Sequence, residues 1–258
     1  MTAAVDLNSD LGEGDPGEGP AASMLGPDAD LLDVVTSANV ACGFHAGGPR
    51  VMDATVAGAA RRRVVVGAHV SYPDLAGFGR RHMDVTPEQL TADVLVQVGA
   101  LDALCRRHGT AVRYVKAHGA LYGDLGTDEA LAATFVAAVR SFDASLAVLA
   151  LPASAVAAAA AAAGTRVVTE GFPDRGYDAG GRLLARSRPD AVLTTPEAVA
   201  ARGVRMARGE PIEAATGSPV VLRAETLCVH SDTPGALRLA TALRDALDGA
   251  GVEVRSFL

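Results

Sequence analysis

The chain has 258 residues, of which 49% are hydrophobic, and this is enough to bury one full-sized core. Asp and Glu number 30 against 23 Lys and Arg, so the net charge of −7 offers no basic field for nucleic-acid phosphates and argues against nucleic-acid binding. The N-terminus lacks the basic and apolar regions of a signal peptide, and no apolar run reaches the roughly 18 residues of a membrane span, so we expect a cytoplasmic protein.

Short apolar runs alternate with longer amphipathic stretches along the chain. The runs expected to form strands are residues 3–8, 35–42, 63–68, 112–117, 145–150, 166–170, 190–194, 225–230 and 252–256. The clearest helix covers residues 87–108, where apolar side chains recur at three- and four-residue steps. Thr86 is its expected N-cap, Pro87 its first residue, Gln89 completes a capping box and Gly109 follows the last turn.

Strands that alternate with helices favour right-handed βαβ units and a parallel sheet. The number of such units in 258 residues favours closure into a (β/α) barrel, with an open doubly wound sheet as the alternative. The Ala-rich segment 152–163 is expected to be a packed helix that ends at Gly164. No linker or repeat marks a second domain, so residues 1–258 are expected to form one domain. The expected long loops are residues 12–27, 72–81 and 171–181.

Four of the six histidines follow predicted strands directly. They are His45, His69, His118 and His230. The carboxyl ends of parallel strands meet on one face of a barrel, which is where active sites of such folds lie. A single histidine at a strand end is more often structural, but four at equivalent positions predict a shared site. His82 and His108 are expected at the surface.

The first predicted strand ends in the acidic motif DLNSDLGEG. Strand alternation places Asp6, Asn8 and Asp10 on one side, facing the barrel interior, and Glu13 follows shortly after. Carboxylates beside histidines suit general acid–base catalysis, because burial and crowding push their pKa values apart. The alternative is a solvated acidic loop with a helix cap.

The chain contains 22 Arg and a single Lys, Lys116. Lys116 precedes His118 by two residues, so in an extended strand both side chains project to the same face. A compact ammonium group can polarise a carbonyl or stabilise an oxyanion where a planar guanidinium does not fit. The alternative is an ordinary surface lysine.

Two loops carry further charged candidates. The loop SYPDLAGFGRR ends in Arg80 and Arg81 and is interpreted as a mobile flap with anion-binding groups. The loop EGFPDRGYDAGGRL presents Asp174, Arg175 and Arg182 after a strand. Either set can instead be plain surface charge. With Asn39 from the second predicted strand, the candidate substrate-binding residues are Asp6, Asn8, Asn39, Arg80, Asp174, Arg175 and His230.

Six motifs that occur in order along the chain resemble the LamB/YcsF family, from residue 5 to about residue 235. They are DLNSDLGEG, SANVACGFHAG, GAHVSYPDLAGFGR, VKAHGALY, DRGYDAGGRL and CVHSD. Members of this family form the A subunit of prokaryotic 5-oxoprolinase. The resemblance implies a distorted TIM-like (β/α) barrel of the glycoside hydrolase/deacetylase type. It also implies ATP-dependent conversion of 5-oxo-L-proline to L-glutamate together with two further subunits, B and C.

The sequence departs from the family pattern at four positions. Ala117 and Val70 stand where proline is usual, which changes backbone stiffness rather than functional groups. Ser231 replaces a glycine after CVH. Gly48 stands where an aspartate often follows HAG, which puts in doubt any role of an acidic group there.

The resemblance and the residue inventory together favour one catalytic set: Asp10, Glu13, His45, His69, Lys116 and His118. Phosphorylation of the lactam oxygen by ATP would make the ring carbon open to attack. Either of the two carboxylates would act as general base, the three histidines would position water and transfer protons, and the lysine would stabilise the oxyanion. The sequence contains no GxxxxGK[ST] loop, so ATP is expected at a subunit interface or on a partner protein.

Two other functions fit the same residues. One is a metal-dependent deacetylase-like hydrolase in which Asp10, His45 and His69 hold a divalent ion. The other is a non-catalytic subunit that binds an amino acid or a carbohydrate. The 5-oxoprolinase interpretation assigns no metal ligand and leaves open whether a metal is bound. The three cysteines lack CxxC spacing and are expected to be reduced thiols.

Overall fold

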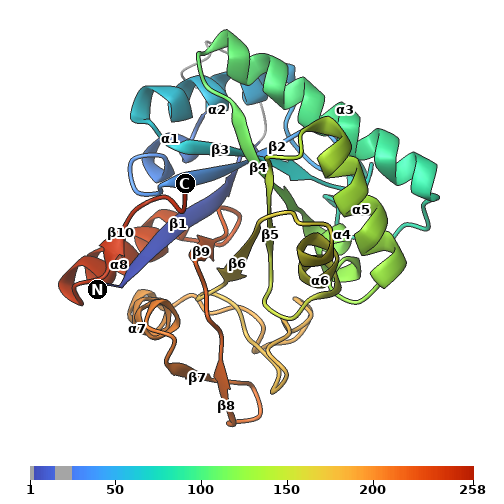
Figure 1. The fold of residues 1–258 in the computed structure, drawn as a ribbon. Helices are drawn as coiled ribbons and strands as arrows, with labels where there is room; N and C mark the ends of the chain where they lie inside the picture. The colour runs from blue at the N-terminus through green and yellow to red at the C-terminus, as the bar shows by residue number, and fades with distance from the viewer. Residues whose placement is uncertain (1–2, 15–24) are drawn as a thin grey trace.

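The computed structural model describes residues 3–14 and 25–258, and in it parallel strands close into a barrel surrounded by helices (Figure 1). Around the barrel, the strands are β1 (Ala4–Leu11), β2 (Ser37–Ala41), β3 (Val65–Val70), β4 (Val112–Ala117), β5 (Ala147–Ala150), β6 (Val167–Gly171) and β9 (Thr226–Val229). Pairing of β9 with β1 closes the ring. The predicted (β/α) barrel is therefore confirmed, and the open doubly wound sheet is excluded.

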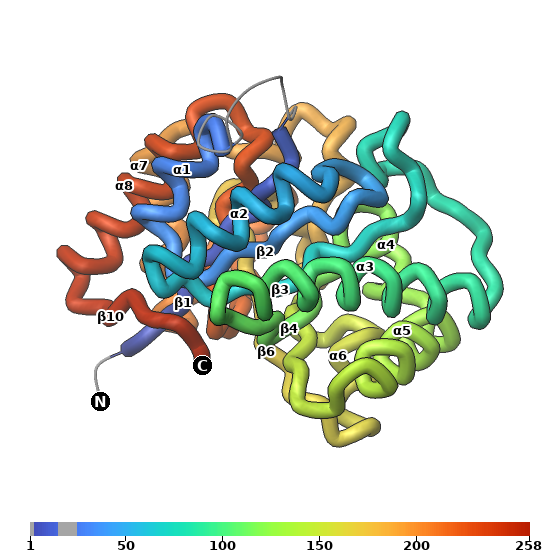
Figure 2. Tube along the Cα trace, turned by 90° about the horizontal axis from the view of Figure 1, so that it is seen from above, coloured from blue at the N-terminus to red at the C-terminus, as the bar shows by residue number. Residues whose placement is uncertain are grey.

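Helices pack around the outside of the barrel, as the view in Figure 2 shows. They are α1 (Asp28–Leu31), α2 (Pro49–Arg62), α3 (Pro87–Arg107), α5 (Glu129–Phe142), α6 (Ala155–Ala162), α7 (Pro196–Ala207) and α8 (Ala236–Gly249). The short helix α4 (Gly119–Asp124) and the 3-10 turn η2 (Leu75–Gly77) lie instead in segments that follow strands. Among the described residues, no helix combines the length and the hydrophobicity that a membrane span needs.

Local signals place the helices as expected. The Thr86 hydroxyl accepts a hydrogen bond from the backbone N–H of Gln89, Pro87 begins α3, and Gly109 follows it with a φ of +70°. The reciprocal half of the predicted capping box is not made, because the Gln89 side chain donates to Asp93 instead. The Ala-rich segment forms α6 as predicted.

One predicted strand is wrong. Residues 190–194 hold only an isolated bridge between Val192 and Arg175. Their backbone groups bond the loop after β6 rather than a neighbouring strand, for example through Leu193 N–H to the Asp174 carbonyl. An antiparallel hairpin of β7 (Pro211–Glu213) and β8 (Pro219–Val221), which was not predicted, projects from the barrel (Figure 1). The short β10 (Glu253–Val254) pairs with the start of β1.

The inner face of β1 is polar, as the alternation predicted. Asp6 accepts hydrogen bonds from Ser37 and Thr226, and Asn8 donates to Thr226. Asn39 in turn donates to Asn8 at 2.7 Å. These side chains are buried and bonded to one another, so the barrel interior carries a polar layer that leads to the carboxyl ends of the strands.

The three cysteines are buried free thiols, as expected. His82 is exposed and His108 is partly buried, and each contacts a carboxylate. Of the predicted loop 12–27, residues 15–24 lie outside the described residues.

Candidate active site

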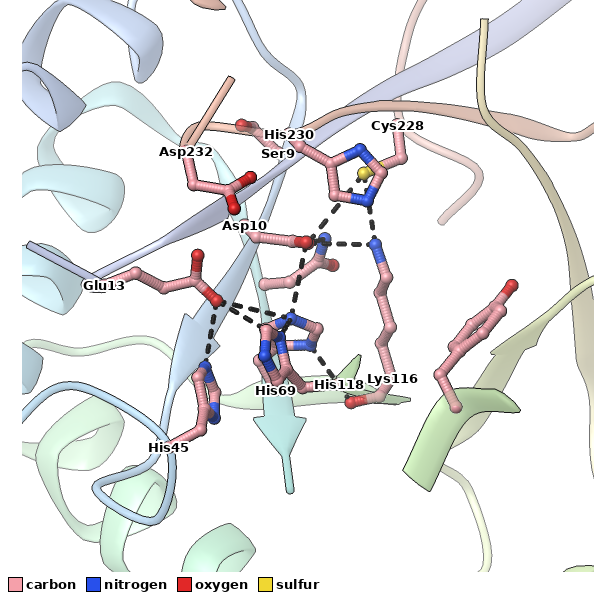
Figure 3. A network of polar contacts seen from close by, with 12 residues as sticks. Ser9, Asp10, Glu13, His45, His69, Lys116, His118, Cys228, His230 and Asp232 are labelled. Carbon is pink, nitrogen blue, oxygen red and sulfur yellow. Dashed lines mark hydrogen bonds and ion pairs between the residues drawn. The ribbon is translucent and has the colours of Figure 1, made fainter. Parts of the chain in front are cut away.

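A cavity of about 320 Å³ opens at the carboxyl ends of the barrel strands. The predicted residues that line it are Asp10, Glu13, His69, Arg80, Lys116, His118, Arg175 and His230. Groups from β1, β3, β4 and β9 thus converge although they are far apart in sequence (Figure 3). Burial also rules out the solvated-loop alternative for the carboxylate of Asp10.

Lys116 lies at the centre of the charged groups. Its Nζ is 2.9 Å from Asp10 Oδ1, 2.9 Å from Glu170 Oε1 and 3.1 Å from Cys228 Sγ. The residue is only 2% exposed, so the surface-lysine alternative is wrong. Burial alone would lower the pKa of Lys116, but attraction by Asp10, Cys228 and Glu170 outweighs it and raises that pKa well above its ordinary value.

Asp10 is held in one orientation by several partners. Its Oδ1 accepts hydrogen bonds from Lys116 and from Asn39, the latter at 2.7 Å, while Oδ2 lies 3.4 Å from His69 Nε2. Burial alone would raise the pKa of Asp10, but His69 and Lys116 hold it well below its usual range. This carboxylate is therefore ionised at neutral pH.

Three histidines surround the carboxylate of Glu13 (Figure 3). Oε1 of Glu13 is 2.9 Å from His45 Nε2, 3.3 Å from His118 Nδ1 and 3.7 Å from His69 Nε2. The His45 and His118 rings are stacked with their centroids 3.7 Å apart, and His69 meets His118 edge-on. We call these four residues the histidine–glutamate cluster.

Burial sets the protonation of this cluster. Burial and the charge of His69 lower the pKa of His45 to about 2, and burial and the neighbouring histidines lower the pKa of His118 still further. Burial and the charge of Asp10 raise the pKa of Glu13 to about 7. Two of the imidazoles are therefore neutral at physiological pH, while the carboxyl group of Glu13 can gain or lose a proton there.

Asp174 and His230 form a second pair beside the cavity. The Nδ1 atom of His230 is 2.8 Å from Asp174 Oδ2, and its ring stacks on Phe172. Asp174 is fully buried and does not line the cavity, so it orients His230 instead of reaching a ligand. Arg175 lines the cavity, but its guanidinium donates to the carbonyls of Ala191 and Leu184.

Arg80 and Arg186 share the carboxylate of Asp232 at the cavity wall. Two guanidinium groups on one carboxylate leave a net positive charge there. The neighbouring Arg81 is not brought into the site, because it pairs with Asp74 and its side chain is 68% exposed.

The segment 71–81, interpreted as a flap, is tied to the barrel. His118 Nε2 bonds the Phe78 carbonyl at 2.9 Å, and the N–H of Ala120 bonds the carbonyl of Gly79, also at 2.9 Å. The segment is therefore a wall of the site.

Asp6, Asn8 and Asn39 were expected to bind substrate, but they do not line the cavity. Their hydrogen bonds go to each other and to neighbouring hydroxyl groups, so the structure places them in the layer beneath it. That layer holds Asp10 in place through Asn39.

Several site residues were missed by the sequence analysis. Glu170 is the next-to-last residue of β6, so a strand-end rule extended to the last residues of each strand would have found it. Asp232 stands within the CVHSD motif. Tyr122 donates to Glu170 Oε2 at 3.2 Å from helix α4. Arg186 lies in a long loop and had no local signal.

Three of the positions at which the sequence differs from the family pattern lie at the ends of strands or at the start of a helix. Val70 and Ala117 are the last residues of β3 and β4, and the Val70 carbonyl accepts from the N–H of His118 at 2.7 Å. Gly48 is the N-cap of α2, and a Cβ there would meet nothing within 4 Å.

Within the described part of the chain, two groups of side chains could hold a metal ion, and neither is the predicted set of Asp10, His45 and His69. One is the histidine–glutamate cluster, and the other consists of Asp10, Cys228 and His230. Asp10 contacts Lys116 and lies 3.4 Å from His69, while Glu13 faces all three histidines of the cluster.

The closed parallel barrel is TIM-like, and its charged groups gather at the carboxyl ends of the strands, where enzymes of this fold have their active sites. The chain matches the model of the LamB/YcsF family over residues 5–258 and belongs to that family. It is 51% identical over 253 residues to the 5-oxoprolinase A subunit of Kocuria rhizophila, covering 98% of each chain.

Solved structures agree on the fold. The lactam utilization protein from Thermus thermophilus superposes with a TM-score of 0.89 at 43% identity, covering 98% of this chain and 100% of that one. A family 4 carbohydrate esterase from Streptomyces lividans, at 12% identity and a TM-score of 0.52, covers 99% of this chain and 93% of its own. The likeness to the esterase is one of fold alone.

Proposed function

We propose that this chain is the A subunit of a multi-subunit 5-oxoprolinase that opens the ring of 5-oxo-L-proline to L-glutamate with ATP. The names of the relatives and of the Thermus lactam utilization protein support this reaction class. The observation that carries the proposal is the buried Lys116, which lies between Asp10 and Glu170 and lines a cavity next to the histidine–glutamate cluster.

The reaction needs an activated carbonyl. ATP transfers its terminal phosphoryl group to the lactam oxygen, water adds to the ring carbon, and the carbon–nitrogen bond breaks as the nitrogen takes a proton. A second water molecule then releases phosphate and leaves the side-chain carboxylate of glutamate. Each step moves protons to or from water in a site that must also stabilise negative charge on oxygen.

The cavity residues match these requirements. Asp10 or Glu13 accepts a proton from water, and the neutral imidazole of His118 positions water and passes protons on. His45, also neutral, does not line the cavity and takes part through its contact with Glu13. Lys116 stabilises the charge that develops on the lactam oxygen.

The positive wall recognises the substrate carboxylate. Arg80 and Arg186 both line the cavity and compete for the single carboxylate of Asp232. A carboxylate bound there would receive charge-assisted hydrogen bonds in place of part of that pairing. In this proposal Arg80 is the residue that anchors 5-oxoproline.

In this proposal neither ATP nor the partner subunits bind inside the barrel. The sequence contains no GxxxxGK[ST] motif. ATP therefore binds at an interface with, or on, the partner subunits B and C in the cytoplasm, and this chain supplies the lactam site. The isolated chain is expected to have little ATPase activity that depends on 5-oxoproline.

The test reconstitutes the chain with subunits B and C and follows glutamate release from 5-oxoproline with and without ATP. Release that requires ATP and all three subunits is expected. Asp10→Asn and Lys116→Met should each lower the rate by at least about 100-fold. The control Arg113→Met, on an exposed side chain of the same strand as Lys116, should not.

Circular dichroism of each variant checks that it folds. An inactive complete mixture, or full turnover by the Lys116→Met complex, contradicts the proposal, and the second result would favour a non-catalytic binding role. Strong 5-oxoproline-dependent ATPase activity of the isolated chain contradicts the proposed division of labour.

A further inference from the structure

The hydrogen bonds on the outer sides of two histidine rings determine which ring nitrogens are bare. His69 Nδ1 is 3.3 Å from the carbonyl oxygen of Lys116, and His118 Nε2 is 2.9 Å from that of Phe78. A carbonyl oxygen only accepts, so these two nitrogens carry the hydrogens of their rings. In the neutral rings, His69 Nε2 and His118 Nδ1 therefore carry a lone pair and no hydrogen.

These two lone pairs point at each other. His118 Nδ1 and His69 Nε2 are 3.0 Å apart, and both also face the Glu13 carboxylate. With both rings neutral, neither of these two nitrogens carries a hydrogen that could bridge them. Such a meeting of electron pairs in a buried site is repulsive unless a proton or a metal cation lies between them.

His45 adds a third imidazole with the same problem. Its Nε2 is 2.9 Å from Glu13 Oε1, while its Nδ1 is buried without a hydrogen-bond partner. If Nδ1 carries the hydrogen, it is a buried donor without a partner, and Nε2 directs a further lone pair at the carboxyl group of Glu13. If Nε2 carries it, Nδ1 remains an unsatisfied buried acceptor.

The spacing of the facing atoms fits tetrahedral coordination. Four of the six separations between Glu13 Oε1, His45 Nε2, His69 Nε2 and His118 Nδ1 are 2.9, 3.0, 3.3 and 3.7 Å. One possible ligand atom from each of the four residues lies within 4.8 Å of the others. Zinc bonds of about 2.0–2.1 Å place tetrahedral ligand atoms about 3.4 Å apart. Backbone carbonyls on the far nitrogens are also the usual support of metal-bound histidines.

We propose that Glu13, His45, His69 and His118 bind one divalent transition-metal ion of the zinc class. Three imidazole nitrogens and one carboxylate oxygen suit zinc or cobalt, whereas magnesium and calcium prefer oxygen ligands throughout. The group of Asp10, Cys228 and His230 is the poorer site, because the ammonium of Lys116 already contacts both Asp10 and Cys228.

The site goes beyond the proposed function, since it binds metal whether or not the reaction is lactam opening. Where the proposed function also holds, the ion occupies Glu13 and the three imidazoles, so Asp10 is the remaining carboxylate that can accept the proton from water. The Oδ2 atom of Asp10 is 3.4 Å from His69 Nε2, at the edge of the cluster. Four protein ligands would leave the ion no open position for substrate or water, which is the arrangement of a structural metal site.

The test is metal binding by the purified full-length chain. After treatment with a chelator, the protein is titrated with zinc chloride by calorimetry and with cobalt chloride by visible absorption, which reports tetrahedral coordination. One equivalent of either ion is expected. Glu13→Gln and His45→Gln should each weaken binding by more than about 100-fold, beyond the loss typical of a residue that only supports a ligand.

Two matched histidines serve as controls. His82 and His108 also contact carboxylates but lie outside the cluster, so His82→Gln and His108→Gln should bind as tightly as the unchanged chain. Circular dichroism verifies that each variant folds.

Failure of the unchanged chain to bind one equivalent overturns the proposal, as does equal binding by Glu13→Gln, His45→Gln and the controls. Stoichiometric binding together with an inactive three-subunit mixture supports the metal site and contradicts the proposed function, so the two failures are distinguishable.

Discussion

The ammonium nitrogen of Lys116 lies 2.9 Å from Oδ1 of Asp10, and both side chains are buried. The pair joins β4 to β1 through the barrel interior, and Glu170 on β6 adds a second carboxylate at 2.9 Å. A buried charge is tolerated only while its partners remain, so this contact couples the stability of the barrel to the site chemistry.

Replacing Lys116 by methionine is expected to lower the free energy of unfolding by about 3–5 kcal/mol, because it leaves two carboxylates buried without their cation. Urea unfolding at neutral pH measures this. The control is Arg62→Met, which breaks a pair with Asp33 on the surface and should cost about 0–1 kcal/mol. Equal losses in the two variants would contradict the structural role of the lysine.

Stability should fall as pH rises through the titration of Asp6. Burial raises the pKa of Asp6 to about 6, while hydrogen bonds from Thr226, Thr36 and Ser37 offset only part of this effect. The unfolded carboxyl group has an ordinary pKa near 3.9, so between these values the folded state holds a proton that the unfolded state has released. The contribution of Asp6 to the free energy of unfolding is therefore fully present below about pH 4 and lost above about pH 6.

The loss amounts to about 3 kcal/mol. The measurement compares the free energy of unfolding of the unchanged chain with that of Asp6→Asn at several pH values from about 4 to 7. The unchanged chain should lose stability relative to the variant by this amount as pH rises. A difference that does not vary with pH would mean that Asp6 titrates normally.

Gly79→Ala is expected to disturb the histidine–glutamate cluster. A Cβ at this position would lie 2.3 Å from Ser71 Oγ and 2.8 Å from both His118 Cδ2 and His45 Cβ, and the φ of +64° disfavours any side chain. The control is Gly217→Ala, which has a φ of +79° but open space around the new methyl group.

The control variant carries the backbone cost of about 1–2 kcal/mol alone. Gly79→Ala should lose more stability than that in chemical unfolding, and it should also lose turnover in the three-subunit mixture, whereas the control retains turnover. Equal stability and equal turnover of the two variants would show that residues 71–81 can shift to fit the new methyl group without disturbing the site.

Arg80→Ala should raise the KM for 5-oxoproline by about 10- to 100-fold with a smaller change in kcat, because it removes a charge-assisted contact to the substrate carboxylate. The adjacent Arg81→Ala removes an exposed guanidinium that pairs with Asp74 and should leave the KM nearly unchanged. Steady-state kinetics of the three-subunit mixture test both. Equal KM values for the two variants would remove Arg80 from substrate binding.

Strand ends were the most informative sequence signal. The rule that polar residues at the ends of parallel strands converge predicted His45, His69, His118 and Lys116, and the structure brings these side chains to one end of the barrel. Glu170, near the end of β6, joins them there through Lys116. Arg186 shows the limit of that rule, because it reaches the cavity from a long loop whose path depends on contacts with distant segments such as the one that carries Asp232. Residues 190–194 have the composition of a strand, yet they bond a loop because no barrel position is left for them.

The order of strands and helices, their caps and the residues at the strand ends follow from the sequence, because periodicity, capping and alternation act over a few residues. Which oxygen faces which nitrogen was decided only by the closed barrel. The pairing of Lys116 with Asp10 and Glu170, and the meeting of three imidazoles at Glu13, join residues far apart in the chain. Their separations and pKa values depend on burial that exists only once the ring of strands has closed.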